Sequence, residues 1–279
     1  MRALLVVVML IFTLALGIAL GAGPLGEKID EERHGPSAAT ATDRRGSDPL
    51  DSALASSVAP SVLATKLAGH RVALVALPGV PYATLTGLSA DIAAAGGAVA
   101  STTRVTTTLT GAAEKPLIEA LGTQVVAQMP GVVDANLTTY PRIGALLGVA
   151  LTTTGAVAPP SANAATLRET FHAGELVQTP ITGDLATLTL VVTGSQVEAP
   201  ILTGMLDGLR GHSRGVVVAG TTRSAGVAAV REAAVPVGAF DGVETDAGRI
   251  GAVLLLARQI TSAGGSFGAS GSDGTLPLG

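Results

Sequence analysis

The residues of this chain that could do chemistry gather in its second half, at the ends of short apolar runs. The first group lies in GTTRS, which follows GVVVA and contains Gly220, Thr221 and Arg223. Backbone N–H groups and an arginine at the end of a strand can surround an anion. Glycine and threonine are also common in ordinary turns, so a purely structural role stays open beside the anion site.

An acidic group, Asp241, Glu244 and Asp246, follows about twenty residues later. Paired carboxylates can exchange protons as acid and base or bind Mg²⁺. The structural alternative is that Thr245 or Asp246 caps the next helix, since acids near a helix N-terminus are stabilised by its dipole. We favour this capping interpretation and keep the degenerate enzyme, built on Asp241, Glu244 and Arg223, as a third hypothesis.

Other reactive patterns are missing from the sequence. The chain has no cysteine, and neither its four histidines nor its four methionines form a cluster of the kind that binds copper. It contains no G-x-x-x-x-G-K-[ST] phosphate loop and no G-x-S-x-G. We therefore predict a protein that is not an enzyme, with no catalytic residue, no metal ligand and no resident cofactor.

A G-x-G-x-x-G pattern, Gly21, Gly23 and Gly26, resembles a dinucleotide loop, and Asp48 has a suitable spacing. The preceding run from Ala3 to Ala22 is too long for the strand that such a loop requires. Twenty residues without a charge or proline span about 30 Å as a helix, the thickness of a bilayer core. We predict a transmembrane anchor at residues 1–26 rather than a cofactor loop, with a cleaved signal peptide as the alternative. The charges that flank the run place the N-terminus in the cytoplasm and export the rest.

The elements that position the candidate residues alternate between strand and helix. Strands are predicted at 72–77, 98–105, 187–194, 215–220 and 235–243, with helical patterns between them. This alternation indicates an α/β fold: a Rossmann-like, mostly parallel sheet with helices on both faces. Ligands bind such sheets beyond the carboxyl ends of the strands. The predicted ligand or partner pocket therefore comprises Gly194, Gly220, Thr221, Arg223, Asp241 and Glu244.

Composition sets the remaining boundaries. Residues 27–66 mix charges, glycine and proline and are predicted to be a flexible linker. Residues 67–265 are predicted to be the exported α/β domain, and residues 266–279 a flexible tail.

The composition also limits the core and the partners. Aromatic residues make up only 2%, so the core must consist of Ala, Val, Leu and Ile. The net charge of −4 leaves no basic stripe for phosphates, which excludes nucleic acid as a partner.

Several segments together carry a family resemblance: ALGIALGAG, HRVALVALPG, DIAAAGGAV, GALLGVAL, LTLVVTG, GVVVAG and DAGRIGAVLLLARQITSAGGSFG. In their order and spacing the chain resembles the actinobacterial copper transporter family (MctB/SteB-like). The resemblance implies a single-pass protein of the cell membrane, with an outer envelope layer as another location, that keeps copper low. For SteB-like members it implies instead an envelope scaffold that controls peptidoglycan hydrolysis and cell separation.

The resemblance also implies partners, namely the membrane and other envelope proteins or further copies of the chain. One apolar helix cannot line a pore, because its backbone is self-satisfied and its faces favour lipid, so transport would need an assembly. The family has a coiled coil after the span, whereas residues 23–46 here contain glycine and proline and no sustained heptads. No functional residue is carried over from the family.

Overall fold

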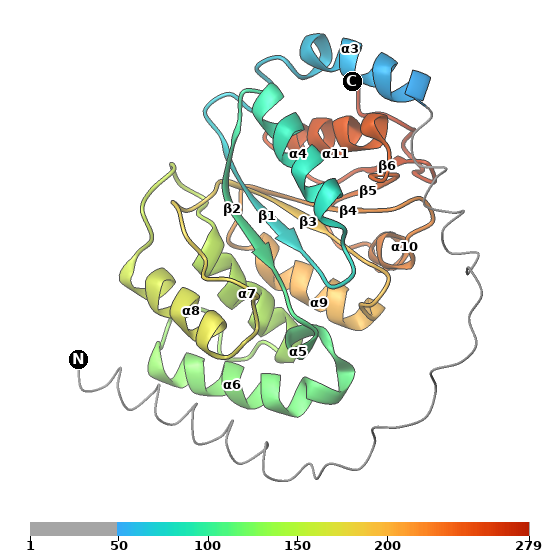
Figure 1. The fold of residues 1–279 in the computed structure, drawn as a ribbon. Helices are drawn as coiled ribbons and strands as arrows, with labels where there is room; N and C mark the ends of the chain where they lie inside the picture. Colours follow the sequence, from blue (N-terminus) through green and yellow to red (C-terminus); the bar gives the residue numbers. More distant parts are fainter. Residues whose placement is uncertain (1–48, 279) are drawn as a thin grey trace, which may run out of the picture. The chain divides into compact units, whose positions relative to one another are not determined.

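The computed structural model describes residues 49–278, so the predicted anchor lies outside the described residues. A six-stranded sheet, in the order β2-β1-β3-β4-β5-β6, forms the centre of the body (Figure 1). All five pairs of neighbouring strands are parallel, which confirms the predicted α/β sheet. The strands are β1 (Arg71–Ala76), β2 (Ala98–Arg104), β3 (Leu188–Val192), β4 (Gly215–Gly220), β5 (Gly238–Asp241) and β6 (Ser266–Gly268).

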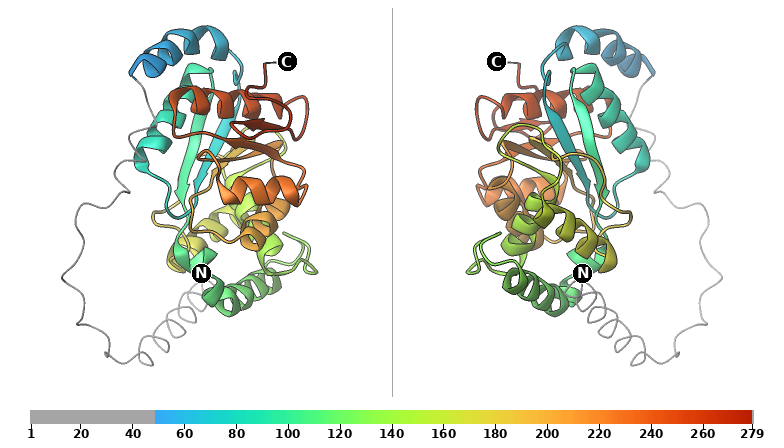
Figure 2. Two further views of the ribbon diagram at one scale, coloured as in Figure 1. Left: turned by 90° about the vertical axis from the view of Figure 1, so that its right-hand side faces the viewer. Right: turned by 90° about the vertical axis from the view of Figure 1, so that its left-hand side faces the viewer.

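Helices cover both faces of the sheet (Figure 2). One face packs against α3 (Pro49–Leu63), α4 (Tyr82–Ala94) and α11 (Asp246–Arg258). The other packs against α5 (Thr107–Thr110), α6 (Lys115–Gln128), α7 (Thr139–Leu151), α8 (Ala162–Ala173), α9 (Ala199–Arg210) and α10 (Ala225–Glu232), with a short 3₁₀ turn, η2, at Ala112–Glu114. Alternate residues of each central strand enter the two cores: in β4, Val216 and Val218 face α9, and Val217 faces α11.

Small side chains let α7 and α9 approach until their backbones touch. Gly144 and Gly148 lie one turn apart in α7, and Gly208 lies opposite them in α9. A Cβ atom on Gly144 would collide with the carbonyl oxygen of Met205, and one on Gly208 with that of Pro141. A core with few aromatic residues thus gains its contacts from close helix packing, at roughly 25 cal/mol per Å² of apolar surface buried.

The folded part extends beyond the residues 67–265 that the sequence analysis assigned to the α/β domain. Helix α3 lies in the predicted linker, and it buries Ala55, Ala59 and Leu63 against the body. Strand β6 lies in the predicted tail, and Phe267 within it is buried. Neither segment could bury enough apolar surface alone, but each gains a partner, α11 for α3 and β5 for β6.

The last crossover differs in hand from the others. The connections β1–α4–β2 and β3–α9–β4 move toward opposite edges of the sheet on opposite faces, so they share one hand. The connection β5–α11–β6 moves in the same direction as β3–α9–β4 but on the α4 face, which gives it the opposite hand. Crossovers of one hand account for about 98% of parallel connections, so β6 is an unusual addition to the sheet.

Candidate functional site

The predicted pocket residues lie at the carboxyl edge of the sheet, and most belong to two neighbouring loops. Gly220 ends β4, Thr221 and Arg223 lie between β4 and α10, and Glu244 lies between β5 and α11. The backbone N–H of Gly242 donates to the carbonyl oxygen of Gly220 at 2.8 Å, which joins the two loops. The sequence prediction that parallel strand ends bring these loops together thus matches the geometry.

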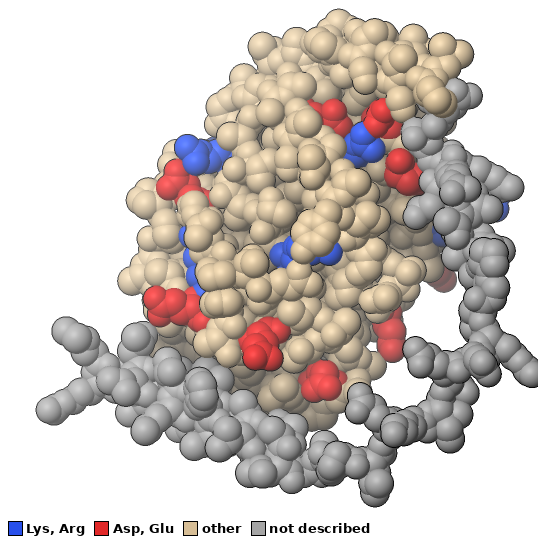
Figure 3. Space-filling view, in the orientation of Figure 1, with Lys and Arg blue, Asp and Glu red and all other residues tan. Residues whose placement is uncertain are grey.

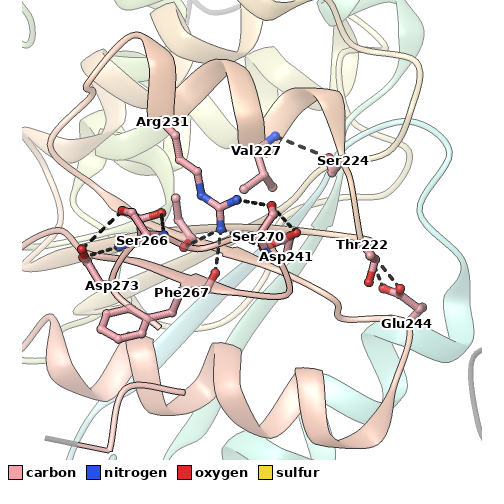
Figure 4. A network of polar contacts seen from close by, with 12 residues as sticks. Thr222, Ser224, Val227, Arg231, Asp241, Glu244, Ser266, Phe267, Ser270 and Asp273 are labelled. Atoms are coloured by element: carbon pink, nitrogen blue, oxygen red, sulfur yellow. Dashed lines mark hydrogen bonds and ion pairs between the residues drawn. The ribbon is translucent and has the colours of Figure 1, made fainter. Parts of the chain in front are cut away.

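Glu244 occupies the position that we predicted for an external anion. Its carboxylate accepts the backbone N–H of Thr222, with oxygen–nitrogen distances of 3.0 and 3.1 Å (Figure 4). The next residue, Arg223, is exposed and has a φ of +61°, the left-handed region that a non-glycine residue rarely adopts. Within residues 49–278 its guanidinium makes no ion pair, so a cation stands beside an amide that already has an acceptor.

Asp241 points away from this loop, toward the edge formed by β6 (Figure 4). It is 1% exposed, and its Oδ1 lies 2.8 Å from Nη2 of Arg231. The hydroxyl of Ser270 donates to Oδ2 at 2.7 Å, and the Ser270 N–H donates to Oδ1 at 3.2 Å. Burial alone would raise the pKa of Asp241, but the hydrogen bonds from Arg231 and Ser270 outweigh it and lower the pKa. The carboxylate therefore has a structural use, which is to hold the β6 segment.

Gly194 lies where the strand order reverses, between β1 and β3, the usual ligand crevice of such sheets. A Cβ atom at Gly194 would collide with the carbonyl oxygen of Pro78 in the loop after β1. The two loops are therefore in backbone contact. The geometry gives Gly194 a packing role at this position.

A comparison with protein families matches residues 1–277 to the family described as "Copper transport outer membrane protein, MctB". The chain belongs to the MctB family. This confirms the resemblance seen in the sequence, and the match includes the N-terminal apolar run as well as the body. A search of curated proteins gives no match.

Membership of the MctB family directs attention to copper ligands. Among the described residues, no group of three or more histidine, aspartate or glutamate side chains could hold a metal ion. His70 lies beside Thr187, with 3.2 Å between Nδ1 and the hydroxyl oxygen. His212 is half-buried against Gly148, and burial lowers its pKa. The prediction that the chain holds no resident metal stays a prediction.

A cavity of about 380 Å³ opens beside β5 and β6 of the MctB-family body. Its lining includes Arg231, Ser266, Ser270 and Asp273, and none of the six predicted pocket residues. In the same part of the chain the backbone N–H of Ser266 donates to Asp273 at 2.8 Å, so several of the polar groups are already paired.

Sequence reasoning missed the partners of Asp241. Arg231 lies ten residues upstream in α10, and Ser270 lies in the stretch that was predicted to be a flexible tail. No motif joins these three residues. The available signal was physical: a carboxylate at the end of a buried apolar strand requires a cation, and Arg231 lies in the last turn of the preceding helix.

The family description names an outer membrane protein, which raises the question of whether a described helix could span a bilayer. Among residues 49–278, no helix combines the length and the apolar character that crossing a bilayer requires. The run from Ala3 to Ala22, on which the predicted single-pass topology depends, lies outside the described residues.

Proposed function

We propose that this MctB-family chain is a membrane-anchored protein of the cell envelope that acts in copper homeostasis without catalysing a reaction. The observation that carries the proposal is the family match over residues 1–277, which covers the apolar run and the α/β body together. A single span cannot form a conduit, so the exported body acts with other envelope proteins or with further copies of the chain.

The geometry at the carboxyl edge supports a non-enzymatic role. The two carboxylates on which an enzyme would depend are engaged inside the protein, Glu244 with the Thr222 amide and Asp241 with Arg231. These contacts leave Arg223 as the exposed charged residue of the predicted pocket, which suits a contact with a partner better than acid–base chemistry.

A deletion strain scored for both copper tolerance and cell separation tests the proposal. Copper sensitivity that the wild-type gene reverses would support copper homeostasis. Normal copper tolerance with chained, unseparated cells would favour the scaffold that controls peptidoglycan hydrolysis.

The enzyme hypothesis is tested in the same strain with Glu244→Ala and Arg223→Ala. We expect Glu244→Ala to restore copper tolerance. Loss of rescue by Glu244→Ala at normal protein levels would contradict the non-enzymatic proposal, provided that a matched surface variant, Asp207→Ala, still rescues. Loss of rescue by Arg223→Ala alone would indicate the partner contact rather than catalysis. Asp207 is about half exposed, and its ion pair with Arg210 is local to α9, which makes it a suitable control.

A further inference from the structure

Exposed apolar side chains of the described body concentrate in α3 and in the C-terminal segment, which we together call the α3 surface. It comprises three residues of α3 and two of the C-terminal segment: Leu50 (74% exposed), Leu54 (62%), Val58 (44%), Leu276 (40%) and Leu278 (69%). Among residues 49–278 only one other large apolar side chain, that of Tyr82, is similarly exposed. Scattered exposed leucines need no explanation, but a group of this kind marks an interaction site.

The outer face of α3 is suited to an apolar environment. Leu54 and Val58 lie one turn apart on it, and Ser57 and Ser61 share the face at helical spacing. The hydroxyl of Ser57 donates to the Leu54 carbonyl oxygen and that of Ser61 to the Val58 carbonyl oxygen, both at 2.8 Å. Because these hydroxyls are paired within the helix, removing the face from water would leave neither donor unsatisfied.

The two parts of the α3 surface share a support. Helix α3 packs on α11, and Leu276 packs on α11 at Gly251, where a Cβ atom would come within 2.9 Å of its side chain. Asp51 is the only charged residue in the sequence of α3. In the space-filling view the top of the molecule, over α3, shows no charged side chain (Figure 3). The surface is therefore apolar and almost free of charge.

The position of α3 in the chain indicates what covers it. Twenty-six residues, 23–48, separate the predicted span from Pro49, the first residue of α3. The composition of this segment predicts a flexible linker, and a flexible linker of that length has an end-to-end distance of about 28 Å. The α3 surface is thus tethered within a short distance of the bilayer, which makes lipid its most concentrated apolar neighbour.

We propose that the α3 surface docks on the lipid bilayer that holds the anchor, with Leu54 and Val58 in the interfacial layer. The inference rests on the proposed membrane anchorage and adds the orientation of the body: α3 and the C-terminal segment face the membrane. A second copy of the chain fits less well, because a stable interface uses about 20–30 residues a side, far more than this surface offers.

The sequence permits a test without background signal, because the chain contains no tryptophan. Full-length Leu54→Trp is reconstituted in phosphatidylcholine vesicles with or without brominated acyl chains. The matched control is Tyr82→Trp, a residue that is 69% exposed and begins α4. Helix α4 is connected to the α3 region at its other end, where the carbonyl oxygen of Ala95 accepts a hydrogen bond from the backbone N–H of Leu67, just after α3. Tyr82 therefore lies at the end of α4 that is far from this contact.

We expect brominated lipid to quench the Leu54→Trp emission about twofold or more, because interfacial residues lie about 5–10 Å into the headgroup and acyl boundary. The Tyr82→Trp emission should change little. Val58→Trp provides a second probe on the same face and should behave like Leu54→Trp. Far-UV circular dichroism confirms that each variant keeps the wild-type fold.

Equal bromine quenching at positions 54 and 82 would overturn the docking proposal. So would a Leu54→Trp probe that is shielded from aqueous iodide yet insensitive to brominated lipid, because a protein partner would then cover the surface. Alkaline extraction separates this failure from that of the proposed function. A chain that leaves the vesicles contradicts the anchor, whereas a retained chain with residue 54 in water contradicts only the docking.

Discussion

Replacing Arg231 by methionine should destabilise the body strongly, because the change leaves the Asp241 carboxylate buried without its cation. The Asp241 side chain is 1% exposed and that of Arg231 16%. Nη1 of Arg231 also donates to Ser270 at 2.8 Å, and Nη2 to the Phe267 carbonyl oxygen at 2.6 Å. Breaking a buried pair by removing one partner costs about 3–5 kcal/mol, and we expect a loss of that size.

The measurement is urea unfolding of the full-length protein in mild detergent, followed by circular dichroism, with the free energy of unfolding compared between variants. Arg231→Met combined with Asp241→Asn should lose clearly less than the sum of the two single losses, because the double variant buries no unpaired charge. The exposed pair Arg210–Asp207 provides the control, and Asp207→Asn should change stability by about 1 kcal/mol or less.

The pH dependence supplies an independent check. The pKa of Asp241 is lower in the folded state than in the unfolded chain, so its stabilisation is present above the unfolded pKa and is lost as the pH falls through the folded pKa. Asp241→Asn should remove this acid-side loss. The reasoning would be refuted if Arg231→Met lowered the free energy of unfolding no more than Asp207→Asn does. It would also be refuted if the stability of Asp241→Asn fell at low pH in the same way as that of the wild type.

Three further predictions concern other parts of the body. Gly194→Ala should lower the free energy of unfolding by about 1–3 kcal/mol through overpacking against the loop after β1, whereas Gly155→Ala, with its nearest neighbour 3.5 Å away, should be tolerated. Burial, only partly offset by Arg249, raises the pKa of Asp91 to about 6, so this carboxyl lowers stability as the pH rises from about 4 to about 6. Asp91→Asn should therefore raise the urea midpoint at pH 7 and not at pH 4. Glu244→Ala should cost about 1 kcal/mol or less, because the hydrogen bond to the Thr222 N–H is exposed and water can replace the lost acceptor, and the same urea titration measures the loss.

The order of strands and helices was predictable because the central strands are continuous apolar runs bounded by glycine or proline. GVVVAG corresponds to β4, and the run from Val72 to Leu77 falls within one residue of β1 at each end. In the helix after residue 199, Ile201, Met205 and Leu209 recur at helical spacing and are buried. In these elements the local pattern and the tertiary environment agree.

The extent of the domain was not predictable from local composition. The sequence of α3 carries almost no charge and has apolar residues on both faces, so no amphipathic period identifies the side that packs on α11. Strand β6 has only three residues, Ser266 to Gly268, and it becomes a strand only because β5 offers an unpaired edge. Both segments acquire structure from partners that are distant in the sequence.

The sequence predicted that the two candidate loops are neighbours, and the binding site assigned to them stays a prediction. Parallel strands place the loop of Gly220 next to that of Glu244, and this follows from topology alone. The direction of Asp241 depends on which face of a four-residue strand points toward α10, and alternation over so short a run does not settle that. The role of Gly194 required the strand order, because its neighbour Pro78 lies in the loop of another strand.

The reversed crossover into β6 has a consequence for biogenesis. Ser266–Gly268 and the Ser270 contact with Asp241 follow every other described element of the sheet in the chain, so a ribosome delivers them last. Until then β5 is a bare edge strand, and Asp241 lacks two of its hydrogen bonds. Bare edges invite pairing with other chains, so polypeptides interrupted after α11 should be the species that aggregate or are degraded. Pairing of β6 with β5 thus covers the exposed edge of the sheet only in chains that have been synthesised beyond α11.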